Sequence, residues 1–238
     1  MQSQLGLRKE RCSIHSNGSQ RLKSATSSLV ICPFPNGPAI LAPSHEEPWT
    51  SFAEARSYLN SGQSPQAIQT LHRILAMPDL ESRHYLQAWH FLRQAGVQPA
   101  ADIAKNVYGV VVEMDFGRGL DIVAAYADGR ARYFNFSGAA IVWESPDNSL
   151  RPLIDDVLRV GKVVADRIGP WEDARPPAPP RGHARINVLT PSGLHFGQAP
   201  FDVLSHDPLG GPVISAAVAL MQALIGKVNE TKASHSAG

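Results

Sequence analysis

The segment in which side chains capable of chemistry lie closest together is Thr190-Pro191-Ser192-Gly193-Leu194-His195. A serine becomes a nucleophile when a histidine within hydrogen-bond reach takes its proton and an acid orients that histidine. Ser192 and His195 are therefore the candidate catalytic residues of a small hydrolase. In the alternative interpretation, which we favour, the hydroxyl of Ser192 bonds the backbone of a turn. His195 alternates with Leu194 and Phe196, which predicts that its ring faces solvent.

Carboxylates are scattered rather than paired along the chain. Three lie near predicted strand ends and one precedes the last predicted helix: Asp115, Asp121, Asp128 and Asp207. Acid–base catalysis needs two groups that converge across a cleft, and no spacing in the sequence indicates such a pair. We therefore assign these carboxylates to turns and to solubility.

Metal and cofactor sites are not indicated. His72, His84 and His90 are spaced so that they do not share one helix face, and the two cysteines, Cys12 and Cys32, lack nearby metal-ligand spacing. No phosphate-cradling glycine loop, nucleophile elbow or zincin helix is present. The segment Gly210-Gly211-Pro212 opens a predicted helix and could hold an anion, but no lysine or arginine lies near it, so we interpret it as a turn.

A proline-rich segment, residues 170–181, is the least ordinary local feature. It has two overlapping P-x-x-P spacings flanked by arginines, a pattern that aromatic-lined grooves bind in polyproline II geometry. The alternative is a stiff connector that loses little entropy on folding. The candidate binding residues are Trp171, Arg175, Pro177, Pro180 and Arg181.

Three helices are predicted ahead of these segments. The first begins near Pro48 and ends at Gly62; the second begins at Ser64, with Pro65 in its first turn, and ends at Pro78. The third covers about 79–96 and carries a tyrosine, a tryptophan and leucines at helical spacing.

Part of this helical region resembles a tetratricopeptide repeat over about residues 53–96. The residues that carry the resemblance are Tyr58, Gly62, Ala67, Ile68, Leu75, Pro78 and Asp79. Such modules need about three repeats to build a continuous core. One and a half repeats therefore imply a helical hairpin that docks on something else, and the family's peptide-binding role is not carried over.

From Val107 the apolar period changes from 3.6 to 2, which predicts strands. Four strands follow up to residue 144, joined by short turns that include Asp128-Gly129, a strong hairpin signal. Such short connections require antiparallel pairing, because a parallel crossover needs a dozen residues or more. The four strands therefore predict a β-meander.

A helix with a long apolar stripe follows from about Leu150 to Ile168, then strands at 183–190 and 194–197, and a last helix from Gly210 to Val228. This order predicts an α+β fold: an antiparallel β-meander of about six strands, with two long helices on one face, preceded by a small helical module. The predicted division is a disordered extension at 1–47, the helical module at 48–105, the α+β domain at 106–228 and a disordered tail at 229–238.

Composition narrows the class of protein. The chain has 238 residues, 43% of them apolar, with 22 basic against 21 acidic side chains. Balanced charge does not favour a nucleic-acid partner, and the prolines after Ala25 interrupt the longest uncharged stretch near the start, so we predict no membrane span there. The basic, acid-poor segment 1–30 shares its composition with a transit peptide, but two cysteines fit a reducing compartment and we predict a cytoplasmic protein.

These observations predict a non-catalytic binding or adaptor protein that works through a protein partner. The alternatives are the hydrolase that uses the Thr190–His195 hairpin and a small-molecule sensor domain. The sensor would enclose an apolar pocket lined by Tyr126, Tyr133, Phe134 or Trp143. A concave pocket that joins His195 to a buried carboxylate would favour the enzyme, and a flat apolar patch would favour the adaptor.

Overall fold

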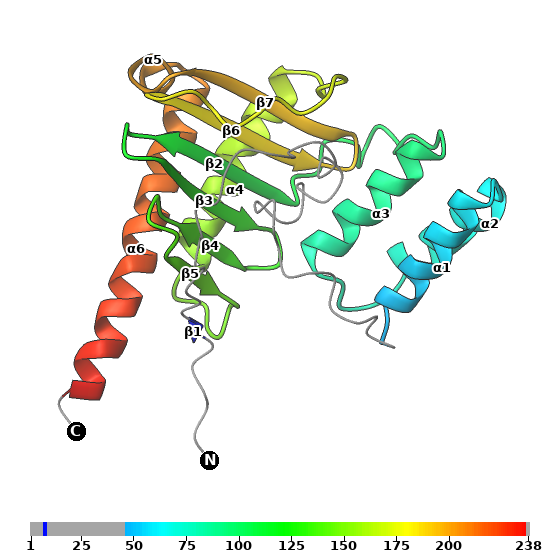
Figure 1. Ribbon diagram of the computed structural model, residues 1–238, viewed down its shortest axis with the longest axis horizontal. Helices are drawn as coiled ribbons and strands as arrows, with labels where there is room; N and C mark the ends of the chain where they lie inside the picture. Colours follow the sequence, from blue (N-terminus) through cyan, green and yellow to red (C-terminus); the bar gives the residue numbers. More distant parts are fainter. Residues whose placement is uncertain (1–6, 9–45, 237–238) are drawn as a thin grey trace, which may run out of the picture.

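The computed structural model describes residues 7–8 and 46–236 of the chain (Figure 1). The helices are α1 Trp49–Asn60, α2 Ser64–Leu75, α3 Ser82–Gln94, α4 Arg151–Arg167, α5 Phe201–His206 and α6 Gly210–Ser236. The strands are β1 Leu7–Arg8, β2 Gly109–Asp115, β3 Leu120–Tyr126, β4 Ala131–Phe134, β5 Ala140–Trp143, β6 His183–Thr190 and β7 Gly193–Pro200.

All strands belong to one antiparallel sheet with the order β1-β5-β4-β3-β2-β6-β7. Strands β2 to β5 form the predicted meander. Strand β6 returns after α4 to pair with β2, so that Val110 lies opposite Val188. The α+β class, the antiparallel sheet and the helical module ahead of it are therefore confirmed.

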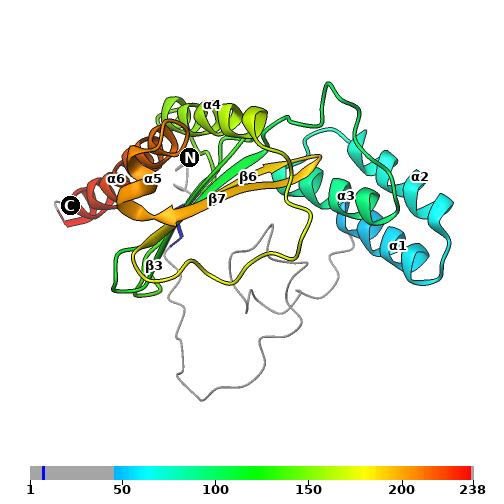
Figure 2. The ribbon, with the colours of Figure 1, turned by 90° about the horizontal axis from the view of Figure 1, so that it is seen from above.

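Helices α4 and α6 cover one face of the sheet, with the short α5 beside α6 (Figure 2). Side chains on this face come from alternate strand positions such as Val110, Val112 and Ile186, and each is almost fully buried. The helices contribute Ile154 and Leu220, among others, to the same core. The period of 2 in the strands and 3.6 in the helices predicts this packing.

Helix α4 approaches the sheet closely at Gly161. A Cβ added there would lie 2.5 Å from a methyl carbon of Val110. Glycine at this position removes the side chain that would otherwise hold α4 away from β2.

The opposite face of the sheet carries a second apolar cluster that includes Val111, Ile122 and Leu189. Residue Leu86 of α3 packs against it, which brings the helical module to the sheet. The segment that follows α4, residues 170–182, crosses this side before it enters β6 (Figure 2). The sheet is therefore packed on both faces, by helices on one side and by α3 and a proline-rich strap on the other.

The helical module is also tied to the meander by a reciprocal pair of hydrogen bonds. The backbone N–H of Ser82 donates to Asp128 Oδ2 at 2.8 Å, and the backbone N–H of Asp128 donates to Ser82 Oγ at 3.1 Å. The rings of Tyr85 and Tyr108 stack at a centroid distance of 5.0 Å. The start of α3 and the β3–β4 turn thus fix each other.

Some predicted boundaries are wrong. The sixth predicted strand, 194–197, is the eight-residue β7, because Gly193–Pro200 pairs with β6 along its whole length. Helix α5 was not expected. Helix α6 continues through Ser236 instead of giving way to a disordered tail at 229, since no glycine or proline interrupts that stretch. Residues 237–238 lie outside the described residues.

The predicted N-terminal extension, 1–47, lies largely outside the described residues, as do Cys12 and Cys32. Within it, Leu7 and Arg8 form β1, which pairs with Trp143 and Val142 at the edge of the sheet. The prediction of disorder is therefore wrong for these two residues.

Helix α6 has the length and composition of a membrane span over Gly210–Glu230, with a mean hydropathy of 1.5. It is the one such helix in the described part of the chain. Its residues Leu220 and Leu224 are fully buried in the core against α4 and the sheet.

Candidate functional site

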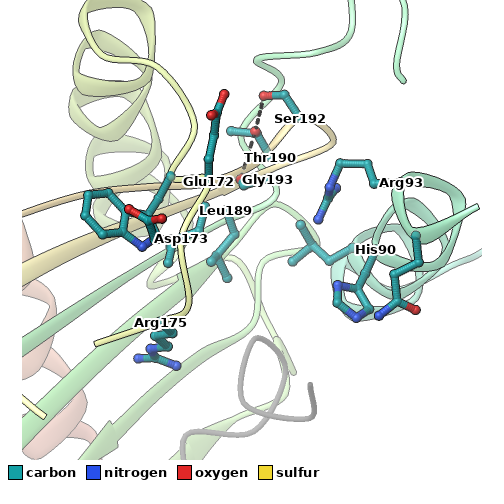
Figure 3. A pocket seen from close by; sticks show the side chains of 13 residues that line it. His90, Arg93, Glu172, Asp173, Arg175, Leu189, Thr190, Ser192 and Gly193 are labelled. Carbon is teal, nitrogen blue, oxygen red and sulfur yellow. Dashed lines mark hydrogen bonds between the residues drawn. The ribbon is translucent and has the colours of Figure 1, made fainter. Parts of the chain in front are cut away.

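A pocket of about 370 Å³ lies between α3 and the β6–β7 hairpin (Figure 3). Helix α3 contributes Leu86, His90 and Arg93, which fall on one face because they are spaced by four and three residues. The hairpin contributes Leu189, Thr190, Ser192, Gly193 and Leu194, and the strap contributes Trp171, Glu172, Asp173 and Arg175. The pocket therefore joins three segments that are far apart in the sequence.

His195 lies behind the pocket wall and is completely buried, with 0% of its surface exposed. The prediction that it faces solvent is wrong. Alternation along β7 turns its ring toward the end of α4, where Nδ1 lies 3.0 Å from the carbonyl oxygen of Ile168. The sequence pattern could not show this neighbour, which lies 27 positions away.

The tautomer of His195 follows from these contacts. The carbonyl oxygen of Ile168 can only accept, so Nδ1 carries the proton and Nε2 of the neutral ring is an acceptor. Two hydroxyls lie within reach of Nε2: Ser192 Oγ at 3.1 Å and Thr190 Oγ1 at 3.2 Å. The Thr190 hydroxyl donates to the Gly193 carbonyl at 3.1 Å and lies 2.9 Å from Ser192 Oγ, so Ser192 is the hydroxyl whose proton is free to go to Nε2 or to Thr190 Oγ1.

Burial lowers the pKa of His195 below its usual value of 6.5, more than the bond to the Ile168 carbonyl raises it. Nearby Lys105 also lowers this pKa, while Asp166 raises it. The neutral ring is therefore favoured, which is the protonation state that accepts a hydrogen bond from Ser192.

The turn that presents Ser192 is fixed from two sides. The backbone N–H of Ser192 donates to the carbonyl of Ala104 at 2.9 Å. Arg93 Nη1 donates to the carbonyl of Pro191, and a Cβ added at Gly193 would lie 3.9 Å from Arg93 Nε. The guanidinium group thus lies beside the turn on the pocket side, as Figure 3 shows.

Arg93 is a half-buried cation, and no carboxylate lies at ion-pair distance from it among the side chains that the structure describes. Burial lowers its pKa from the usual value. Neighbouring His90 also has a lowered pKa, because of burial first and the charge of Arg93 second. The Nε2 atom of His90 is buried and has no hydrogen-bond partner within the described part of the chain.

The predicted binding residues of the strap have contacts within the chain. Trp171 is 42% exposed; its ring packs edge-on against Phe196 at a centroid distance of 4.6 Å, and its backbone N–H donates to Leu194 at 2.6 Å. The carbonyl of Pro177 accepts from Arg185 Nη2. Pro180 accepts from the backbone of His183 at 3.0 Å and is exposed, as is Arg181.

Arg175 belongs to a buried ionic cluster that anchors the strap. Its Nη2 lies 2.7 Å from Glu113 Oε1, and Arg185 Nη1 lies 3.4 Å from Glu113 Oε2. Asn187 donates to the same carboxylate at 3.3 Å, and Arg185 donates to Gln198 at 2.6 Å. The connector interpretation accounts for these contacts, since they hold residues 175–177 against the sheet.

The carboxylates assigned to turns make local bonds. Asp115 accepts from Gly117 at 2.6 Å, Asp121 from the Tyr133 hydroxyl at 2.9 Å, and Asp207 from Gly210 at 2.7 Å. Burial and the bond to Asp121 raise the pKa of Tyr133 to about 12. These three side chains lie outside the pocket between α3 and the hairpin.

Gly210 and Gly211 allow α5 and α6 to meet closely. A Cβ added at Gly211 would lie 2.6 Å from the carbonyl oxygen of Ser205. Packing therefore explains both glycines, without an anion.

The four aromatic residues expected to enclose a sensor pocket lie on opposite faces of the sheet. Trp143 and Tyr133 belong to the core under α4 and α6, while Tyr126 and Phe134 belong to the cluster on the other face. They do not line one cavity.

Arg93 was not predicted as a site residue, and His90 was considered only as a metal ligand. The available signal was their spacing from Leu86, which puts two polar residues on the apolar side of the third helix. Histidines His72 and His84 do not line the pocket, and the described residues contain no group of three histidine, cysteine or acidic side chains that could hold a metal ion.

No family model, curated protein or solved structure matches this chain. The resemblance of residues 53–96 to a tetratricopeptide repeat therefore stays a prediction.

Proposed function

We propose that the protein is a binding protein whose pocket between α3 and the β6–β7 hairpin takes a small organic acid with an apolar body. The observation that carries this proposal is Arg93, a half-buried guanidinium at the pocket wall with no carboxylate partner in the described part of the chain. A buried charge costs free energy unless it is paired. A bound carboxylate would supply the missing partner.

The other walls favour an apolar ligand body. Leu86, Leu189, Leu194 and the ring of Trp171 line the pocket, and burying such surface contributes roughly 25 cal/mol per Å². Glu172 and Asp173 are exposed on the strap, where solvent screens their repulsion of an anion. The volume, about 370 Å³, lies in the range typical of small-molecule sites.

Recognition of a protein partner through the proline-rich segment has less support. The side chain of Arg175 and the carbonyl of Pro177 are used within the chain. An exposed Trp171 and the exposed Pro180 and Arg181 remain available to a partner, so the adaptor role stays a prediction.

Equilibrium binding of phenylacetate, compared with its neutral analogue phenylacetamide, tests the proposal. A hydrogen bond to a charged group contributes about 1.5–3 kcal/mol, so phenylacetate should bind roughly tenfold to a hundredfold more tightly. Arg93→Gln should remove this preference. The matched control is Arg159→Gln, since Arg159 is 68% exposed on α4. Equal binding of the two compounds to the wild-type protein would overturn the proposal.

A further inference from the structure

We infer that Ser192 is a nucleophile activated by His195, and that the pocket hydrolyses esters of small apolar carboxylic acids. The inference rests on the proposed pocket as the place where the acyl group lies. The inference goes beyond the proposed binding function because it assigns a reaction to the pocket. From the sequence alone, a hydrolase was the less favoured alternative.

Ser192 and His195 have the geometry of a nucleophile and its base. Ser192 Oγ lies 3.1 Å from His195 Nε2 and lines the pocket, whereas the histidine ring is buried behind it. A nucleophile must meet substrate and a base must be held in place, which is the division seen here. The bond from Nδ1 to the Ile168 carbonyl orients the ring, the role that a carboxylate has in a Ser-His-Asp triad.

A positive charge lies beside Ser192, at the site of the proposed reaction. Arg93 donates to the carbonyl of Pro191 and lies beside Gly193, the residues on either side of Ser192. When a serine attacks an ester, negative charge develops on the carbonyl oxygen, and a fixed cation nearby stabilises it. The same guanidinium would then bind the carboxylate of the released acid.

The reaction balances with the groups present and water. Ser192 Oγ bonds to the ester carbonyl carbon while its proton moves to His195 Nε2. The bond from that carbon to the alcohol oxygen breaks, and the alcohol leaves with the proton from Nε2. Water then attacks the acyl-serine, gives a proton to Nε2, and releases the acid as Ser192 regains its hydrogen.

A purely structural network is the competing explanation, because Ser192 also satisfies the buried ring of His195. The two explanations differ in reactivity. A structural serine does not form a covalent bond with an electrophile, whereas a nucleophile paired with a histidine attacks one quickly.

The test is covalent labelling of the full chain by a fluorophosphonate, located by mass spectrometry of peptides. The bond from Ser192 Oγ to phosphorus forms, fluoride leaves, and the serine proton passes to His195. We expect one label per chain, at Ser192. The label should vanish in Ser192→Ala and form about a hundredfold more slowly in His195→Gln.

The matched control is Ser137→Ala, since Ser137 is exposed in the β4–β5 turn and bonds Asn135, not a histidine. It should be labelled like the wild type. An unlabelled Ser192 in the wild-type protein overturns the inference even if His195→Gln fails to fold, and so does an equal rate in a folded His195→Gln. Phenylacetate binding to Ser192→Ala is measured separately, so a functional pocket without reactivity is distinguished from failure of both proposals.

Discussion

At the scale of single residues, the polar groups around His195 form a closed network. Both ring nitrogens of His195 have polar neighbours: Nδ1 lies at a backbone carbonyl, and the hydroxyls of Ser192 and Thr190 lie within hydrogen-bond reach of Nε2. Buried polar groups are tolerated when they are satisfied in this way. The network holds the tip of the β6–β7 hairpin against the end of α4, and it also holds Ser192 at the pocket.

Acidification is expected to destabilise the fold through His195. The pKa of His195 is lowered in the folded chain, so the unfolded chain takes up a proton at a higher pH. The stability contributed by the neutral ring is therefore complete above pH 6.5 and is lost as the pH falls toward the lower folded value. The thermal unfolding midpoint should fall between about pH 7.5 and 5, and fall less in His195→Gln.

Two other histidines contribute with the same sign, because burial also lowers the pKa values of His84 and His90. Part of the pH dependence should thus remain in His195→Gln. A control, His72→Gln, changes an exposed residue of α2 and should keep the whole dependence. If the unfolding midpoint falls equally on acidification in the wild type and in His195→Gln, the ring of His195 is not held neutral.

At the scale of elements, the contact between α4 and the sheet depends on a position without a side chain. Gly161 lies over Val110 and Val188, two fully buried residues of adjacent strands. Helix α6 contains a glycine of another kind: nothing lies within 4 Å of a Cβ added at Gly226. The two positions separate the effect of packing from that of helix propensity.

Gly161→Ala should destabilise the protein, and Gly226→Ala should stabilise it. Alanine gains about 0.5–1 kcal/mol over glycine within a helix. At 161 the added methyl would overlap Val110, and overpacking costs about 1–3 kcal/mol. Urea denaturation of both variants measures the difference. A similar increase in the free energy of unfolding in both variants would mean that α4 can move away from the sheet without cost.

At the scale of the whole molecule, the pocket exists because three regions are fixed relative to one another. The reciprocal bonds of Ser82 and Asp128 hold the helical module on the meander. Glu113 of β2 pairs with Arg175 of the strap and with Arg185 of β6, and these contacts hold the strap against the sheet. Because Arg175 also lines the pocket, the ionic cluster positions one of its walls.

Glu113→Gln is expected to lower the free energy of unfolding by about 3–5 kcal/mol, because it leaves the charge of buried Arg185 without its carboxylate. The control is Glu144→Gln. Glu144 pairs with Arg130 at 2.8 Å but is 45% exposed, and such surface pairs contribute about 0–1 kcal/mol. Denaturant titration of both variants decides the point, and equal, small losses would show that the cluster does not anchor the strap.

The local pattern of the sequence is enough to predict the α+β class, the meander and the face on which α4 and α6 pack. Short turns such as Asp128-Gly129 permit only antiparallel pairing, and the periods of 2 and 3.6 assign each apolar residue to a face. These signals lie within a few residues of one another, so they can be read without knowledge of the rest of the chain.

The candidate site was only partly predictable. The sequence indicated Ser192 and His195 as a possible pair through their spacing of three residues, and the pair is in contact. It could not show that His195 is buried, because Ile168, at the end of α4, reaches it from a distant part of the chain. Arg93 was not predicted for the same reason. Its neighbour, the β6–β7 turn, is known only once α3 has been placed against the hairpin.

What the sequence by itself determined is therefore the long helices, the strands β2 to β6 and their apolar faces, though not α5 or β1, because the period of apolar residues depends on positions that are close in the chain. The tertiary structure alone decided which polar groups meet: Arg93 with the Pro191 carbonyl, His195 with Ile168, and Glu113 with Arg175 and Arg185. Such contacts depend on how α3, the strap and the sheet come together, and this depends on packing summed over the whole fold.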